Sequence, residues 1–316
     1  AVGQEKPVST LKLTVKEAAQ QWLISAKLRV KPSSYANYLS IVNKHILPIL
    51  GSVCMTDLTA SRMNDFIMQK LQHGRLSGKG GLSAKSVRDI MTVFRSISVY
   101  VSKEYGIREV HFTMPKSEQK SVEVLTAAER RKLEQYLMDN PDRTNLAVLL
   151  CMFTGLRVGE LCGLRWEDID LERGIIRIRR NVTHPTRNLA VVGDTKTQLS
   201  KRDIAISQIA RPYIEEAAAQ AASMHHFLFG GAQPLSYTQH RQLMRRISKQ
   251  MDIKGITGYT FRHTIITDVY EETHDANIAA AVAGHSKTTI TMNRYAHARR
   301  DSAVRGIKAL DEAYNL

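Results

Sequence analysis

The amino-acid sequence predicts a mainly α-helical protein of two domains, the second of which also contains a small antiparallel sheet. Apolar residues recur at intervals of three and four along most of the 316-residue chain, a pattern typical of amphipathic helices. Only residues 174–206 show the alternation that half-buried strands produce. The length favours about two domains, and a polar, proline-containing stretch at 114–122 marks the expected linker.

The first domain is expected to consist of four helices within residues 12–113, preceded by a flexible segment at 1–11. Each predicted helix combines a start signal with an apolar stripe. The starts lie at Thr14, Pro32, Thr59 and Ser83. Pro48 and Gly51 are expected to end the second helix, since proline disrupts a helix interior and glycine favours a helix end.

The second domain is expected to span residues 123–316. Thr126 followed by Glu129 forms a capping box, which predicts the start of a helix. A strongly apolar helix is predicted at 145–153. Strands are predicted at 174–180, 188–192 and 202–206. After Arg211 the chain is predicted to be helical to its end, where an amphipathic tail helix must bury its apolar stripe.

Composition points first to a nucleic-acid partner. The chain has 45 Lys and Arg against 30 Asp and Glu, a net charge of +15, and a basic protein of this kind attracts phosphate. No apolar run approaches the roughly 20 residues of a membrane span, and no signal-peptide pattern opens the sequence. We therefore expect a cytoplasmic protein that is nucleoid-associated when bound to DNA.

The cysteines and histidines do not predict a metal centre. Three cysteines, at 54, 151 and 162, are too few and too scattered for a disulfide framework or a zinc site. Cys151 and Cys162 lie in apolar stretches and are expected to be buried thiols. His225, His226 and His240 have no partners at metal-ligand spacing and are interpreted as surface or packing residues. No cofactor is expected.

Tyr295, ten residues after His285, is the candidate nucleophile. A phenol has a pKa of about 10 and is a poor nucleophile on its own at neutral pH, but cationic neighbours that neutralise a phosphate change this. Arg157 and Arg262 provide permanently charged, fork-shaped donors. Lys196 would protonate the leaving oxygen, and His285 would donate a further hydrogen bond to the phosphate.

Each of these residues also has a structural interpretation when it is taken alone. Arg157 would form an ion pair with Glu160, and Lys196 would be a solvated turn residue. His285 would cap a helix, and Tyr295 would be a core aromatic. Their order and local sequence contexts, taken together, favour the catalytic interpretation.

Four segments, in this order along the chain, resemble the catalytic boxes of the tyrosine recombinases, the phage-integrase family. They are residues 154–160, 195–202, 261–264 and 284–297. The first half of the chain also resembles the family's helical core-binding domain, notably over residues 35–51. The overall pattern is similar to integrases of conjugative transposons and related integrative elements. The resemblance implies a core-binding domain at 12–113 and an α+β tyrosine-recombinase catalytic domain with a small antiparallel sheet at 123–316.

The resemblance also implies a role for each matching residue. Tyr295 attacks the scissile phosphate to give a 3′-phosphotyrosyl link and a free 5′-hydroxyl. Arg157 and Arg262 clamp the phosphate, Lys196 is the general acid, and His285 supports the phosphate. No metal is required, because the guanidinium pair stands where a divalent ion would in other nucleases. No ATP is required, because the covalent link conserves the energy of the DNA backbone bond.

One position departs from the family pattern. Tyr259 stands three residues before Arg262, where the family usually has histidine. A tyrosine can hydrogen-bond to a phosphate, but it is a poor base at neutral pH. The general base is therefore left open. His263 is a candidate substitute, although a structural hydrogen bond is the favoured interpretation of this residue.

The implied function is site-specific DNA recombination that integrates and excises a mobile genetic element. The implied partners are double-stranded DNA at specific recombination sites and three further copies of the chain, in a tetramer held together by the C-terminal tail. An excisionase or directionality factor is a further candidate partner, and no membrane partner is expected. The main alternative is a non-catalytic DNA-binding or architectural protein of the same fold. A type IB topoisomerase and a metal-dependent nuclease fit the sequence less well.

Overall fold

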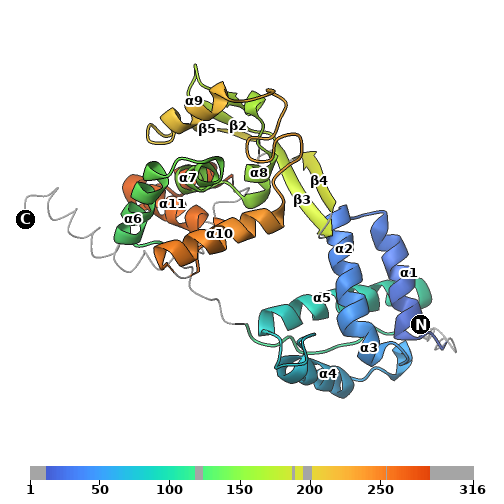
Figure 1. Cartoon of the computed structure of the whole chain (residues 1–316). Helices are drawn as coiled ribbons and strands as arrows, with labels where there is room; N and C mark the ends of the chain where they lie inside the picture. Colours follow the sequence, from blue (N-terminus) through green and yellow to red (C-terminus); the bar gives the residue numbers. More distant parts are fainter. Residues whose placement is uncertain (1–11, 118–123, 187–188, 195–200, 254, 285–316) are drawn as a thin grey trace, which may run out of the picture. The chain divides into compact units, whose positions relative to one another are not determined.

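The computed structural model describes residues 12–117, 124–186, 189–194, 201–253 and 255–284. The chain divides into two compact units, residues 1–120 and 121–316. Each unit has its own hydrophobic core. Figure 1 shows the helices and strands of both units.

The first unit is helical throughout its regular elements. Its helices are α1 (Val15–Lys27), α2 (Pro32–Ile41), α3 (Leu47–Leu50), α4 (Ala60–His73) and α5 (Ala84–Tyr105). The helix starts predicted at Thr14, Thr59 and Ser83 are confirmed. Each of these side chains accepts a hydrogen bond from a backbone N–H three residues further on, which satisfies a donor that the first turn leaves unpaired.

The prediction that Pro48 ends the second helix is wrong. A π-helical turn, Val42–Ile46, follows α2 and leads directly into α3. The N–H of Leu47 donates to the carbonyl of Val42 across this turn. Pro48 then occupies the second position of α3, where a missing N–H has little cost because first-turn donors have no intrahelical partner. The helical path ends at Gly51.

The core of the first unit joins all its long helices. Trp22 of α1, Phe66 of α4 and Phe94 of α5 are buried in one cluster of apolar side chains. The ring of Trp22 packs against that of Tyr38 with centroids 5.2 Å apart. This core accounts for the apolar stripes from which the helices were predicted.

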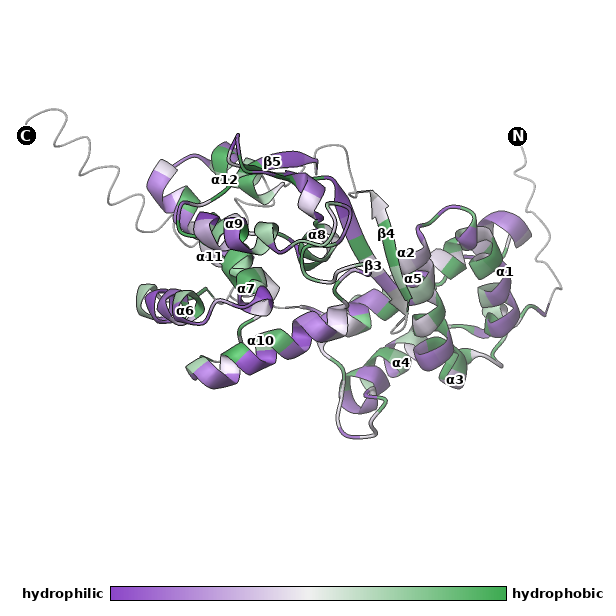
Figure 2. Ribbon diagram, turned by 45° about the horizontal axis from the view of Figure 1, so that its top comes forward, coloured by the Kyte–Doolittle hydropathy of each residue, from purple (hydrophilic) through white to green (hydrophobic). Residues whose placement is uncertain are grey.

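The second unit combines seven helices with five short strands within the described residues. Its helices are α6 (Ala127–Asp139), α7 (Arg143–Thr154), α8 (Val158–Gly163), α9 (Arg211–Ala219), α10 (Tyr237–Met251), α11 (Gly258–Thr273) and α12 (Ala276–Ala283). The strands are β1 (Ile169–Asp170), β2 (Ile175–Ile178), β3 (Arg180–Thr186), β4 (Leu189–Asp194) and β5 (Arg202–Ala205). In Figure 2, α10 is apolar along one side and polar along the other, as a surface helix should be.

The strands form two separate antiparallel sheets. β1, β2 and β5 make a three-stranded sheet in the order β1-β2-β5, with Ile176 opposite Ile204. β3 and β4 form a separate hairpin whose register shifts between Thr183 and Thr186. The predicted strand at 174–180 therefore corresponds to β2 and the first residue of β3. The rest of β3 was not predicted.

The core of the second unit is built mainly by α7, α10 and the sheet. Its buried side chains include Trp166 and Phe261. Cys151 and Cys162 are buried, as predicted, and burial raises the pKa of Cys162 to about 12 and that of Cys151 further. Both thiols are therefore protonated at neutral pH and unreactive. Within the described residues, no helix combines the length and apolar character that crossing a membrane requires.

Candidate active site

Arg157 is placed by a tight turn between α7 and α8. Gly155 ends α7 with φ of 60°, a left-handed conformation that favours glycine. A β-carbon at this position would lie 2.6 Å from Cγ2 of Ile265, so close packing also requires glycine. Arg157 follows as the N-cap of α8 with an extended backbone. The Thr154–Arg157 segment is thus a rigid support for the guanidinium group.

Arg157 is paired with the buried carboxylate of Glu160. Its Nη1 donates to Oε1 of Glu160 at 2.6 Å, and its backbone N–H donates to Oε2 at 3.1 Å. Glu160 is only 2% exposed, whereas the Arg157 side chain is 33% exposed. The structural ion pair considered from the sequence therefore exists. The Arg157 side chain nevertheless stays partly exposed.

Arg202, at the start of β5, is the second cation on Glu160. Its Nη2 lies 3.0 Å from Oε2 of that carboxylate. Burial is the largest influence on the pKa of Glu160 and acts to raise it, but the charges and hydrogen bonds of Arg202 and Arg157 together outweigh burial. The pKa of Glu160 is therefore below its ordinary value, and the side chain is ionised at neutral pH.

Arg262 lies in the second turn of α11 and is 3% exposed. Its Nη1 donates to the carbonyl of Gly155 at 2.7 Å, and its Nη2 donates to the carbonyl of Ala283. One guanidinium group therefore joins the C-terminal ends of α7 and α12. Both carbonyls belong to helix ends, where backbone acceptors lack intrahelical partners.

Three arginines converge on the last turn of α12. Arg262 donates to the carbonyl of Ala283, Arg202 Nε donates to that of Val282 at 3.2 Å, and Arg157 Nη2 donates to that of Gly284 at 2.8 Å. A helix C-terminus carries partial negative charge, so cations are favourable there. Arg157 and Arg262 were predicted from the sequence as site residues. Arg202 was not, although it lies in the basic Ser200-Lys201-Arg202 segment after Lys196.

The remaining predicted site residues are placed only in part. Tyr259 is the second residue of α11 and is 61% exposed. Its ring centroid lies 6.4 Å from that of His263, which is buried. Lys196, His285 and Tyr295 lie outside the described residues. However, Gly284, whose carbonyl Arg157 contacts, is the residue immediately before His285.

His240 packs behind the first turn of α11. It is buried, and its Nε2 has no hydrogen-bond partner within the described part of the chain. Burial lowers the pKa of His240 to about 4, so the ring is neutral at neutral pH. A β-carbon at Gly258 would approach Cε1 of His240 to 3.3 Å. His240 is therefore a packing residue, as predicted.

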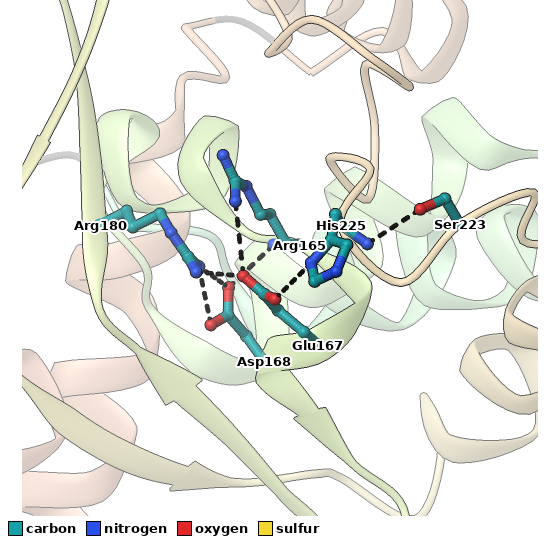
Figure 3. Close-up of polar contacts among 6 residues, drawn as sticks. All are labelled: Arg165, Glu167, Asp168, Arg180, Ser223 and His225. Atoms are coloured by element: carbon teal, nitrogen blue, oxygen red, sulfur yellow. Dashed lines mark hydrogen bonds and ion pairs between the residues drawn. The ribbon is translucent and has the colours of Figure 1, made fainter.

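A second polar cluster fixes the first residue of the β3–β4 hairpin (Figure 3). Nη1 of Arg180 donates to both oxygens of Asp168, at 2.8 and 2.7 Å, and Nη2 contacts Glu167. Glu167 also contacts Arg165 and, through a 2.8 Å hydrogen bond, the exposed His225. The hydrogen bond with His225 is the largest factor that lowers the pKa of Glu167. The cluster ties the hairpin to the 3₁₀ turn Trp166–Asp168.

Replacing Glu160 with glutamine is expected to lower the free energy of unfolding by about 3–5 kcal/mol at pH 7, since two arginines then lose their buried counter-charge. The pKa of Glu160 is lowered from an ordinary value near 4.5 in the unfolded chain. Its stabilisation is therefore complete above that value and is lost as the pH falls through the folded-state pKa. The measurement is chemical denaturation of both proteins between pH 3 and 7. A difference in the free energy of unfolding between the two proteins that stays constant down to pH 3 would contradict the role of ionised Glu160.

Comparison with known proteins confirms the family resemblance found in the sequence. The chain matches the phage integrase family over residues 123–301 and the phage integrase N-terminal SAM-like domain over residues 14–71. Tyrosine recombinase XerA of Pyrococcus furiosus is 26% identical over 215 residues, which cover 65% of this chain and 68% of that protein. The transposase of transposon Tn916 from Enterococcus faecalis is 24% identical over 181 residues, 52% of this chain but only 45% of that protein.

Solved structures share the fold over nearly the whole chain. The Tn1549 transposon integrase in complex with transposon right end DNA superposes with a TM-score of 0.79 at 20% identity, covering 94% of this chain and 99% of that one. A λ integrase dimer bound to a core site gives a TM-score of 0.66 at 20% identity, covering 89% and 95%. The family match spans more than half of the chain and contains the arginine cluster at the end of α12. The chain therefore belongs to the phage integrase family of tyrosine recombinases.

Proposed function

We propose that this protein is a site-specific DNA recombinase that cleaves and rejoins strands through a covalent link to Tyr295. The observation that carries the proposal is the convergence of Arg157 and Arg262, from separate helices, on the carbonyls of Ala283 and Gly284. These carbonyls directly precede the segment that contains His285 and Tyr295.

The proposed reaction is an in-line exchange of two bonds to phosphorus. The hydroxyl oxygen of Tyr295 forms a bond to the scissile phosphorus and loses its proton to a water molecule. The bond from phosphorus to the 5′ oxygen breaks, and Lys196 supplies the proton that makes this oxygen a 5′-hydroxyl. Attack by the 5′-hydroxyl of another strand on the phosphotyrosine reverses the sequence and joins the new partner. The number of phosphate ester bonds is unchanged, so no external energy source is needed.

The charge balance of the described residues supports this chemistry. Two guanidinium groups, on Arg157 and Arg202, share one carboxylate, that of Glu160, and a third, on Arg262, binds the nearby carbonyls of Gly155 and Ala283. The cluster therefore has an excess of positive charge, as a site for a phosphate and its more negative transition state requires. Guanidinium groups remain protonated at any physiological pH. We propose that Arg157 and Arg262 clamp the phosphate and that His285 donates a further hydrogen bond to it.

Tyr259 is proposed as a phosphate ligand. It is exposed in the first turn of α11, where backbone N–H groups and the helix dipole favour an anion. Its hydroxyl would donate a hydrogen bond to a non-bridging oxygen. The tyrosine would then replace the usual histidine in binding the phosphate without acting as the base.

We further propose that the region 12–113 binds the DNA core site and that 123–316 contains the catalytic site. The names of similar structures support DNA as the partner, since they describe a Tn1549 integrase with a circular intermediate DNA and a λ integrase tetramer bound to a Holliday junction. By analogy, this protein would act as a tetramer through its C-terminal tail and would integrate and excise a mobile element. A directionality factor would select between the two reactions.

Covalent capture on nicked DNA tests the proposed function. The probe is a library of duplexes with a randomised core and a nick in the cleaved strand. Cleavage near the nick releases a short fragment that carries the 5′-hydroxyl. Once this fragment has diffused away, the reverse reaction has no nucleophile and the covalent intermediate is trapped. The wild-type protein is expected to form adducts that resist denaturation, and mass spectrometry should locate the DNA on the peptide containing Tyr295. Selective binding to the same duplexes without any adduct would instead favour the non-catalytic DNA-binding alternative.

A further inference from the structure

The side chain of Arg202, at the start of the short strand β5, is largely buried and contacts two other elements of the second unit. The side chain is 9% exposed. Its Nε donates to the carbonyl of Val282 and its Nη2 to Glu160, residues 80 and 42 positions away in the sequence. The backbone of Gly284 also lies against the guanidinium group, since a β-carbon there would be 2.7 Å from Nη1. This one side chain therefore joins β5, α8 and the end of α12.

We infer that Arg202 is a positioning residue for phosphate binding: it supplies the counter-charge for Glu160 and fixes the last turn of α12, so that Arg157 is left to act on the phosphate. This inference rests on the proposed function. Arg202 itself is buried against protein groups. It acts through Arg157 and the end of α12.

The electrostatic part of the inference follows from the sharing of Glu160. Oε1 of Glu160 accepts from the Arg157 side chain, while Oε2 accepts from Arg202 and from the Arg157 backbone. With two cations on one carboxylate, the group formed by Arg157, Arg202 and Glu160 carries a net positive charge. Without Arg202, the charge of Arg157 would be matched by Glu160 alone. The attraction of Arg157 for a phosphate would then be weaker.

The geometric part of the inference concerns α12. This helix has only eight residues, a length at which isolated helices are unstable and tertiary contacts must hold them. Arg202 caps its last turn from the side of the sheet, and Arg262 caps it from α11. Loss of one cap would loosen the carbonyl of Gly284, to which Arg157 is bonded.

The test compares Arg202→Gln and Arg202→Lys with the wild type on the nicked duplex recovered by covalent capture. Single-turnover cleavage at saturating DNA is expected to fall by about 10²-fold in Arg202→Gln, the loss that a small misplacement of a functional group can cause. The half-saturating DNA concentration should change little. Arg202→Lys retains the charge near Glu160 but cannot reach both acceptors, so an intermediate rate is expected.

A neutral substrate distinguishes positioning from loss of fold. A methylphosphonate at the scissile position removes the phosphate charge that Arg157 is proposed to neutralise. The Arg202→Gln variant should therefore approach the wild-type rate on this substrate. Arg177→Gln is the matched control, since it removes a partly buried ion pair with Asp170 in the same sheet. We expect the control to cleave both substrates like the wild type.

Hydrogen exchange of the α12 peptide gives a readout that needs no cleavage. Backbone amides of the last turn of α12 should exchange faster in Arg202→Gln than in the wild type. In Arg177→Gln they should exchange at the wild-type rate. Wild-type cleavage rates in both Arg202 variants, or unchanged exchange in α12, would overturn the inference. So would equal losses of cleavage, DNA binding and thermal stability without recovery on the methylphosphonate. If the wild type forms no adduct, the proposed function fails, whereas exchange still shows whether Arg202 holds α12.

Discussion

Tyr295→Phe is expected to abolish covalent capture of DNA while leaving DNA binding intact. The substitution removes one oxygen atom, the proposed nucleophile, and keeps the ring. Removing a catalytic nucleophile typically costs about 10⁶ in rate, which places the residual reaction below detection. The measurement is a time course of denaturation-resistant adducts on the nicked duplex, with binding measured on the intact duplex.

Tyr237→Phe is the matched control for this experiment. Tyr237 is also exposed, at the start of α10, and is not among the proposed site residues. It should form adducts at the wild-type rate. Adduct formation by Tyr295→Phe at that rate would show that another residue, such as Tyr314 in the tail, is the nucleophile. Loss of DNA binding together with the adduct would mean that Tyr295 is a structural residue.

Arg262→Lys is expected to reduce cleavage by at least about 10²–10³, the loss typical of removing one transition-state donor. A single ammonium group cannot reach the carbonyls of Gly155 and Ala283 together as the guanidinium fork does. Each buried carbonyl that loses its partner costs about 1–3 kcal/mol in the free energy of unfolding. Both the rate and the stability should therefore fall, although the positive charge is retained.

Arg246→Lys provides the matched control for Arg262→Lys. Arg246 Nη2 donates to Thr144 and Asn145 at 3.1 and 3.2 Å, in the same unit as Arg262. We expect this variant to cleave DNA like the wild type. Arg262→Lys with an unchanged cleavage rate would show that only a charge is required at the site. A loss of stability with an undiminished rate would restrict Arg262 to a structural role.

The local elements of the fold were largely predictable because their signals are local. Thr14, Thr59 and Ser83 cap helices through atoms three residues away, a distance that a sequence pattern reveals. The π-helical turn before Pro48 was not predictable in this way, since its apolar stripe resembles that of an ordinary helix. Most of β3 was missed because residues 181–186 lack the alternation of a half-buried strand.

The residue types of the site were predictable from the sequence, but the contacts between those residues were not. The pairing of Arg157 with Glu160 spans three positions and was anticipated as an alternative. The contact of Arg157 with Gly284 spans 127 positions, and that of Arg262 with Gly155 spans 107. Such contacts depend on how α7, α11 and α12 pack. For the same reason Arg202, whose partners are 42 and 80 positions away, received no role from the sequence.

The two separate hydrophobic cores have a consequence for how this protein can evolve. Among the described residues, the buried cluster of the first unit ends at Val110 and that of the second begins at Leu125. Substitutions far apart and without shared partners have nearly additive effects on stability. A mutation in the core of the first unit therefore needs no compensating change in the core of the second unit. Under the proposed assignment of core-site binding to residues 12–113, target preference can diversify there while the arginine cluster of the second unit stays constant.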